Sequence, residues 1–161
     1  MPAAPLPTEQ ILTLLADAPA RLAALTAEVP AARLATPPSP EEWAAVDVLA
    51  HMRACADQWG GAILTILAQD HPTLRAMNPR TWINQTDYPQ QAFADSLAAY
   101  TRQRRALLAL LEPLGPGEWA RGATVTGAGK PLERTVQFYA HWLARHERAH
   151  VKQIARLVRT R

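Results

Sequence analysis

Hydrophobic and polar positions follow a helical period over four long stretches of the chain, which proline, glycine and polar segments separate. The helices expected from this pattern cover residues 8–28, 40–69, 90–112 and 131–158. Alternation typical of β-strands is not convincing anywhere, and no internal repeat is visible. The pattern therefore predicts an all-α fold, a four-helix bundle formed by one domain spanning residues 1–161.

Local signals refine the ends of these helices. Thr8 and Ser39 are expected to act as N-caps, with Pro40 at the first position of the second helix. Pro19 is expected to kink or split the first helix, because proline lacks the N–H that an interior position donates. The loops before the third and fourth helices are long enough to act as crossover connections and to line a ligand pocket.

Three histidines fall on the inward faces of the predicted bundle. With about 100° of rotation per residue, His146 and His150 lie about 40° apart on the last helix, within one apolar stripe. That stripe consists of Leu132, Val136, Tyr139, Trp142, Leu143, Ile154 and Leu157. His51 lies in the apolar stripe of the second helix, among residues that include Val48 and Ile66. All three imidazoles are therefore expected to point into the bundle.

These histidines have the spacing of metal ligands. Two imidazoles one helical turn apart suit bidentate binding of one ion, although a hydrogen-bonded core pair explains His146 and His150 equally well. His51, from a second helix, supplies a third ligand and favours the metal. We therefore predict one divalent ion at His51, His146 and His150, with an open coordination position for water or substrate.

Several nearby residues have more than one interpretation. Asp47 and Gln58 lie near the same face, as acceptors behind the metal ligands or as ordinary boundary residues. Cys55, one turn after the histidine of the second helix, either approaches the metal or packs as a small core residue, the commoner role. His141 is expected to point outward, and His71 to lie in a solvated loop.

Residues 146–150, HERAH, match the H-E-x-x-H pattern of zinc proteases, in which Glu147 would activate a zinc-bound water. Such enzymes take a third ligand further along the chain, but no His, Asp, Glu or Cys follows His150. Glu147 also lies about 100° from the histidine stripe, toward the edge of the bundle. Both observations disfavour a protease.

Composition adds a small positive charge, since 17 Lys and Arg stand against 14 Asp and Glu and give a net charge of +3. The basic residues are spread along the chain apart from a cluster on the last helix, opposite the histidines. This cluster consists of Arg145, Arg148, Lys152, Arg156 and Arg159. It is typical of a solvated helix face, and without a recognised binding motif no nucleic-acid partner is expected.

The location of the protein is expected from three further features. Cys55 is the single cysteine, which excludes an internal disulfide and suits a reducing compartment. The N-terminal segment MPAAPLPTEQ lacks the features of a signal peptide. No stretch approaches the roughly 18 apolar residues of a membrane span. We therefore expect a soluble, cytoplasmic protein with no membrane partner.

Two segments resemble a known family. EEWAAVDVLAHM places a tryptophan several residues before His51, and HWLARHERAHVKQIARLVR contains an H-x-x-x-H pair followed by Gln153 and Ile154. The segment WINQTDYPQQAF and the glycine-rich loop before the last helix fit the same pattern. Taken together, and over nearly the whole chain, these features resemble the DinB-like, or DinB/YfiT-like, metalloenzymes.

The resemblance implies a four-helix bundle with a long crossover and a zinc or nickel ion bound by His51, His146 and His150. It also implies a homodimer. Characterised members include thiol-dependent S-transferases that use bacillithiol or mycothiol, and a mycothiol-dependent maleylpyruvate isomerase. Many members have no known activity, so the resemblance predicts the metal site better than the reaction.

We therefore expect a metal-dependent enzyme that acts on a small molecule, with S-transfer from a low-molecular-weight thiol as the leading hypothesis. Trp82, Tyr88 and Arg121, in the long loops, either shape the electrophile pocket and hold an anionic group of the thiol or have packing roles. Metal-dependent hydrolysis is one alternative. A non-catalytic metal-binding or stress-related bundle is another.

Overall fold

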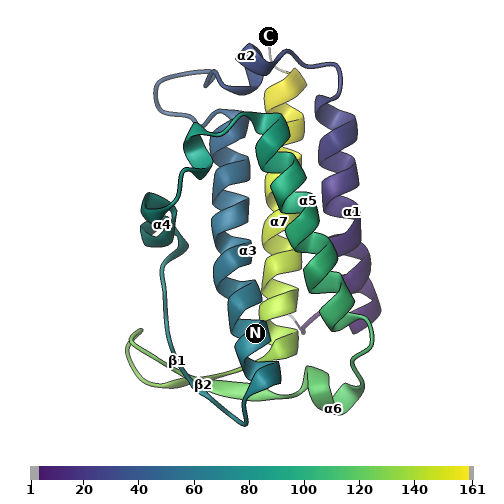
Figure 1. The fold of residues 1–161 in the computed structure, drawn as a ribbon, viewed down its shortest axis with the longest axis vertical. Coiled ribbons are helices and arrows are strands. Elements are labelled where there is room, and N and C mark those ends of the chain that lie inside the picture. Colours follow the sequence, from purple (N-terminus) through teal and green to yellow (C-terminus); the bar gives the residue numbers. More distant parts are fainter. Residues whose placement is uncertain (1–3, 160–161) are drawn as a thin grey trace.

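The computed structural model describes residues 4–159 and contains four long helices packed side by side (Figure 1). They are α1 (Thr8–Thr26), α3 (Ala45–Ala68), α5 (Phe93–Leu111) and α7 (Val136–Arg159). α1 and α7 run in one direction, and α3 and α5 in the other (Figure 1). The predicted four-helix bundle is confirmed. The single-domain assignment stays a prediction, and residues 1–3 and 160–161 of that span lie outside the described residues.

The connection between α3 and α5 is a crossover. After α3 the chain returns along the outside of the bundle, so that α5 begins at the same end as α3 (Figure 1). Its short elements are α4 (Pro79–Trp82) and two 3₁₀ turns, η1 (Ile83–Gln85) and η2 (Tyr88–Gln90). Two further short helices, α2 (Ala31–Leu34) and α6 (Pro116–Trp119), lie in the other loops. The long loop between α3 and α5, which the sequence analysis expected to allow a crossover, spans the length of the bundle in this connection.

A small sheet, for which the sequence shows no convincing strand pattern, closes one end of this mostly helical fold. It contains β1 (Thr73–Arg75), β2 (Gly122–Thr126) and β3 (Leu132–Thr135). β2 pairs with β1 in parallel and with β3 antiparallel. β2 alternates between buried and partly buried residues over only five residues, β1 and β3 are shorter still, and β1 finds its partner only through tertiary contact. Leu132 therefore belongs to β3, and the last helix begins five residues later than Pro131.

The start of the second long helix also differs from the prediction. α3 begins at Ala45, and Ser39 and Pro40 lie in the preceding turn. The Asp47 carboxylate accepts a hydrogen bond from the backbone N–H of Ala44 at 3.0 Å, which caps the helix. Ser39 instead donates its hydroxyl to Glu42 at 3.1 Å. This polar turn carries the same residue types as a first helical turn, so the sequence pattern predicts helix there.

Pro19 lies inside a continuous α1 and neither splits nor ends it. A proline at this position leaves the carbonyl oxygen of Leu15, one turn earlier, without its helical donor. Arg104 of α5 supplies the missing donor, because its Nη1 atom donates to that carbonyl at 3.0 Å. A partner from another helix thus removes much of the cost of the proline.

Arg104 belongs to a buried ion pair that joins α5 to α7. Its Nη2 atom donates to the Glu147 carboxylate, and the hydroxyl of Tyr100 donates to the same carboxylate at 2.7 Å. Glu147 is only 1% exposed, so its predicted position at the bundle edge is wrong. α7 packs against both α3 and α1, so a wider arc of this helix is buried than one stripe.

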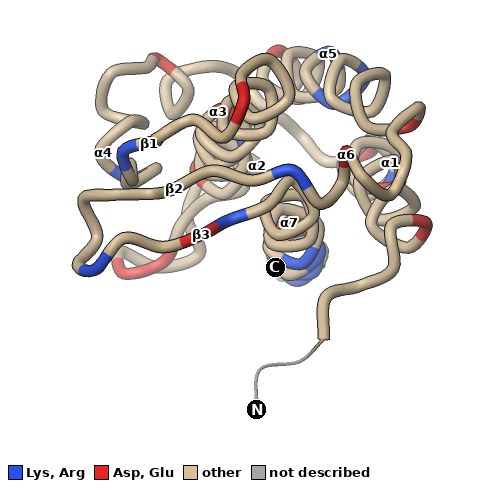
Figure 2. The backbone as a smooth tube through the Cα atoms, turned by 90° about the horizontal axis from the view of Figure 1, so that it is seen from below, with Lys and Arg blue, Asp and Glu red and all other residues tan. Residues whose placement is uncertain are grey.

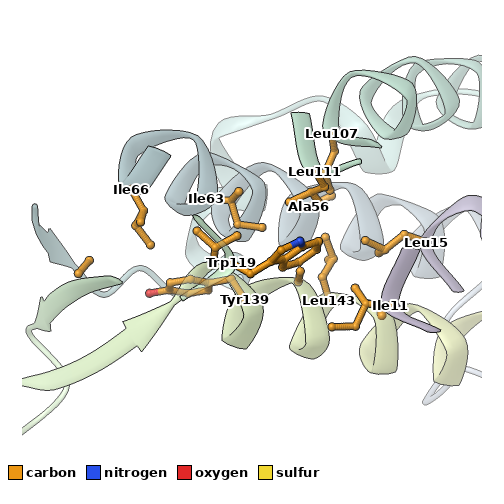
Figure 3. Close-up of a cluster of buried hydrophobic side chains, with 14 of the residues drawn as sticks. Ile11, Leu15, Ala56, Ile63, Ile66, Leu107, Leu111, Trp119, Tyr139 and Leu143 are labelled. Carbon is orange, nitrogen blue, oxygen red and sulfur yellow. The ribbon is translucent and has the colours of Figure 1, made fainter. Parts of the chain in front are cut away.

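The apolar core fixes how α3 and α7 are rotated against each other. Its larger cluster draws side chains from all four long helices and from α6 (Figure 3). Among its members are Ile11, Leu15, Ile63, Leu111, Trp119, Tyr139 and Leu143. A second cluster, around Leu49, Met52 and Ile154, fills the other end. The burial of these two clusters fixes the rotation of α3 against α7, and this rotation sets the direction of their polar side chains.

The outer surface of α7 carries the predicted basic cluster. Figure 2 shows Lys and Arg positions on the side of α7 that faces away from α3 and α5. All five of these side chains are exposed, as the helical period predicts. Between residues 4 and 159, no helix combines the length and the apolar character that a bilayer crossing requires.

Candidate metal centre

The three predicted histidines come together between α3 and α7. The Nε2 atom of His146 lies 3.1 Å from Nε2 of His51 and 3.0 Å from Nε2 of His150. The ring centroids of His51 and His150 are 5.0 Å apart. His146 therefore occupies the middle of the cluster, with one imidazole on each side.

These nitrogens fit a divalent ion better than they fit one another. Two ligands at about 2.0–2.1 Å from a tetrahedral zinc lie about 3.3 Å apart, close to both Nε2 separations. A neutral imidazole nitrogen donates or accepts one hydrogen bond in its ring plane. His146 Nε2 therefore has two imidazole nitrogens nearby but can form a hydrogen bond with only one of them. A cation accepts a lone pair from each nitrogen, so the pair of His51 and His146 fits a metal site, and His150 adjoins it through His146.

Burial keeps two of these imidazoles uncharged at neutral pH. Burial, followed by the charges of His150 and Arg80, lowers the pKa of His51 to about 4. Burial, followed by the charges of His150 and His51, lowers the pKa of His146 to about 3. Both rings thus offer lone pairs at pH 7 without first losing a proton, as metal ligands must.

The rings are oriented in different ways. The Nδ1–H of His150 donates to Oε1 of Gln153 at 2.8 Å, which leaves its Nε2 lone pair facing the cluster. The Nδ1 atom of His146 is buried and has no hydrogen-bond partner among residues 4–159. His146 is instead packed against aromatic rings, with centroid distances of 5.3 Å to Trp59 and 5.5 Å to Trp142. Packing therefore orients His146, and a hydrogen bond orients His150.

The aromatic surroundings correct one prediction. The helical period predicts Trp142 in the buried stripe of the last helix, but its side chain is 43% exposed and covers Trp59, with ring centroids 4.4 Å apart. It lies on the edge of that stripe, where the neighbouring helix no longer covers a large ring. Trp43, just before α3, lies 5.3 Å from the ring of His51. Indole rings therefore border the cluster on both helices.

Cys55 also faces the cluster. Its Sγ atom lies 3.6 Å from Nε2 of His51 and 3.8 Å from Nε2 of His146. In the described chain, the ligand atoms of His51, Cys55 and His146 all lie within 4.8 Å of one another. The side chain is 1% exposed, and burial, followed by the charge of Glu147, raises the pKa of its thiol to about 12. Cys55 is thus both a core residue and a neighbour of the expected ligands.

One pocket gives access to all three histidines. It has a volume of about 480 Å³, and its lining consists of Glu41, Glu42, Trp43, His51, Arg80, His146, His150, Gln153, Arg156 and Leu157. A larger hollow of about 850 Å³ lies along the first half of α7, but His146 is the one member of the histidine cluster that lines it. The smaller pocket is therefore the route by which a molecule reaches the whole cluster.

The loop residues considered for the electrophile pocket have structural contacts instead. The indole N–H of Trp82 and the hydroxyl of Tyr88 both donate to Oδ2 of Asp57, at 3.0 and 2.7 Å. Gln103 donates to the other oxygen of that carboxylate at 2.6 Å. These bonds tie the crossover loop and α5 to α3. Sequence reasoning missed Asp57, because an isolated carboxylate on a helix carries no signal of its distant partners.

Arg121 likewise serves the fold. Its guanidinium donates to the carbonyl oxygens of Leu67 and Gln69, at 3.0 and 2.7 Å. These carbonyls are at the end of α3, where the helix leaves its last acceptors unpaired. Arg121 therefore caps α3, and the alternative of a packing role holds for all three loop residues.

The other candidates lie away from the cluster or act locally. Asp47 caps α3 rather than supporting a ligand. His141 is partly buried, and its Nδ1 atom accepts a hydrogen bond from the backbone N–H of Leu6 at 2.9 Å. His71 is exposed as predicted, and its Nε2 lies 3.0 Å from the Glu133 carboxylate. Gln58 is partly buried on α3, and its role behind the ligands stays a prediction.

Comparison with known proteins agrees with this description. Among solved structures, YfiT from Bacillus subtilis, described as "a probable metal-dependent hydrolase with an unusual four-helix bundle topology", shares 19% sequence identity with this chain. The two match with a TM-score of 0.75 over 97% of this chain and 91% of that one, so they share a fold. A search of curated proteins finds no match.

The sequence itself carries the family assignment. The sequence model of the DinB superfamily matches residues 14–154, which include the histidine cluster and most of the bundle. The resemblance inferred from the tryptophan and histidine spacing is thereby confirmed. The chain belongs to the DinB superfamily.

Proposed function

We propose that this protein is an enzyme that holds one divalent ion, zinc or nickel, at His51, His146 and His150 and acts on a small molecule. The observation that carries the proposal is the clustering of three imidazoles from two helices, all of which line one pocket. Two of these imidazoles are neutral at pH 7, as ligation requires.

The bound ion would supply Lewis acidity, which lowers the pKa of a thiol or water that it binds and polarises a substrate oxygen. The chain contributes the positioning. Arg80 and Arg156 lie in the pocket wall, so Arg156 departs from the predicted position opposite the histidines, and both suit a carboxylate or phosphate of the substrate. Glu41 and Glu42 lie in the same wall and suit a cationic group or a proton released in the reaction. Trp43 closes the side next to His51.

S-transfer from a low-molecular-weight thiol is the first reaction that we propose. The family resemblance supports it, and so does the mixed charge of the pocket, because bacillithiol and mycothiol are polar thiols whose groups need donors and acceptors. In this reaction the thiol gives up its proton and attacks a small electrophile. The pocket residues hold the polar part of the thiol beside the histidines.

Hydrolysis is the second candidate, and one observation favours it. YfiT, which shares the fold, is described as a probable metal-dependent hydrolase. A pocket that carries Glu41 and Glu42 beside the histidines has carboxylates to accept a proton from water. The two reactions use the same ligands and differ in whether a thiol or water is the nucleophile.

Metal binding is tested first, by elemental analysis of the purified protein and of two variants of α7. We expect about one ion per chain in the unaltered protein and in Arg148→Ala, whose side chain is exposed two residues after the central ligand. We expect His146→Ala to lose the ion, because His146 is the ring that adjoins both others. Equal metal content in all three proteins would contradict the site.

The reaction is tested with the metal-loaded protein and two substrate panels. One panel combines bacillithiol or mycothiol with model electrophiles, and the other contains esters, amides and phosphates without thiol. We expect turnover in one panel that His146→Ala abolishes and Arg148→Ala preserves. Turnover in the first panel supports the transferase, and turnover in the second supports the hydrolase. Activity that is unchanged in His146→Ala would rule out the site as its source.

A further inference from the structure

We propose that Cys55 is a direct ligand of the ion that the histidines hold, an inference that rests on the metal binding proposed above. The three-histidine site would thus gain a thiolate from the buried side of the cluster. The resemblance to the family implies imidazole ligands, and Cys55 adds a ligand that belongs to this chain's own sequence.

The distances support ligation by sulfur. A zinc–sulfur bond of about 2.3 Å and a zinc–nitrogen bond of about 2.0–2.1 Å place sulfur and nitrogen about 3.6 Å apart around a tetrahedral ion. Sγ of Cys55 lies 3.6 Å from Nε2 of His51 and 3.8 Å from Nε2 of His146. One position can therefore lie at bonding distance from all three atoms. The sulfur needs to move by only a few tenths of an ångström.

The helical positions explain why the sulfur is there. Cys55 follows His51 by four residues on α3, so its side chain lies one turn further along the same face. His146, on the antiparallel α7, faces this gap between the two turns. The packing of α3 against α7 therefore places Cys55 beside the two histidines that it would join.

The surroundings of the sulfur also point to a cation. Cys55 is buried, and the polar atoms that it approaches are imidazole nitrogens. A bound cation stabilises the thiolate form of a coordinating cysteine. On ligation the S–H bond breaks, the proton passes to solvent, and the sulfur electron pair binds the ion. No oxidant or reductant takes part.

Ligation from this side leaves the pocket available. The three histidines line the 480 Å³ pocket, whereas Cys55 is outside its lining and behind them. With four protein ligands, the ion would take the substrate as a fifth ligand from the pocket, on the opposite side to the sulfur. The thiolate also lowers the net charge of the site by one and favours zinc or cobalt over harder ions.

Cobalt(II) tests this inference, because a thiolate bound to cobalt produces a charge-transfer band in the near ultraviolet that imidazole ligands do not. We would add one equivalent of Co²⁺ to the full-length, metal-free protein and record both the visible and the near-ultraviolet spectrum. Cys55 is the single cysteine, so any thiolate band belongs to it. The matched variant is Cys55→Ser, which keeps the size of the side chain and removes the sulfur.

We expect the unaltered protein to show the near-ultraviolet band together with visible bands of tetrahedral cobalt. We expect Cys55→Ser to lose the near-ultraviolet band, keep visible bands and bind cobalt at least about tenfold more weakly. His150→Ala should keep the near-ultraviolet band. Cobalt binding without this band in the unaltered protein would overturn the Cys55 ligand and leave the histidine site standing. Failure to bind cobalt, zinc or nickel at all would overturn the proposed function itself.

Discussion

At the scale of single residues, the site depends on side chains whose orientation has an identifiable cause. Gln153 fixes the ring of His150 through a 2.8 Å hydrogen bond, and indole rings pack against His146. The helical period predicted that all three histidines face inward. Each residue turns the helix by about 100°, so the direction of a side chain can be worked out without knowing its neighbours. The same reasoning misplaced Glu147 and Trp142, because it assumes one buried stripe of fixed width.

The first prediction concerns Gln153. In Gln153→Ala the Nδ1–H of His150 loses its acceptor, so the ring is free to rotate and to exchange its proton between the two nitrogens. We expect the zinc affinity to fall by about 10–100-fold, as for other partners behind metal ligands. A competition titration with a chelator of known affinity measures it. Lys152→Ala, which removes an exposed neighbour, should leave the affinity unchanged.

At the scale of helices, the bundle is held by an apolar core and by a few buried polar links. Arg104 connects three helices, because it bonds to the carbonyl of Leu15 in α1 and to Glu147 in α7 from its own position in α5. The four helices could be predicted from their periodic stretches. The strands and the start of α3 could not, since short strands depend on distant partners and turn residues resemble a helix start.

The second prediction tests the buried ion pair. Glu147→Ala leaves the guanidinium of Arg104 buried without its counter-charge, so we expect the free energy of unfolding to fall by about 3–5 kcal/mol. Urea denaturation measures this change. Glu112→Ala, at an exposed carboxylate at the end of α5, should change it by less than about 0.5 kcal/mol.

The double variant Arg104→Met with Glu147→Met separates the charge from the contact. It removes both charges and keeps apolar volume in the core, so it should be more stable than Glu147→Ala alone. A single variant as stable as the Glu112→Ala control would show that the pair contributes nothing to holding α5 against α7.

At the scale of the whole molecule, the site joins two helices that come from opposite halves of the sequence. An ion bound to α3 and α7 at once links them in the folded protein and loses its site when the protein unfolds. The homodimer implied by the family resemblance is a property at this scale and stays a prediction, as does the cytoplasmic location.

The third prediction is that zinc stabilises the fold. At a free zinc concentration one hundred times the dissociation constant, we expect the free energy of unfolding to rise by about 2.7 kcal/mol. Thermal unfolding followed by circular dichroism, with and without zinc, provides the measurement. His146→Ala should show no zinc-dependent shift in melting temperature, and a shift as large as in the unaltered protein would place the ion elsewhere.

The fourth prediction concerns acid. In the folded, metal-free protein the pKa is lowered to about 4 for His51 and about 3 for His146, against 6.5 for an unperturbed histidine. Below pH 6.5 the unfolded chain therefore binds protons that the folded chain does not, and stability falls with pH until the folded pKa values are reached. We expect lower stability at pH 5 than at pH 7 in urea unfolding. A double variant, His51→Gln with His146→Gln, should show a weaker dependence.

The sequence by itself determined the four helices, the inward direction of the three histidines and the family, because each depends on periodicity or spacing along one segment. Tertiary structure alone decided that Cys55 lies beside His146, that Arg104 compensates for Pro19, and that β1 joins β2. Each of these pairs residues that are far apart in the chain. Their contact depends on how side chains of several helices pack together, and a one-dimensional pattern does not contain that information.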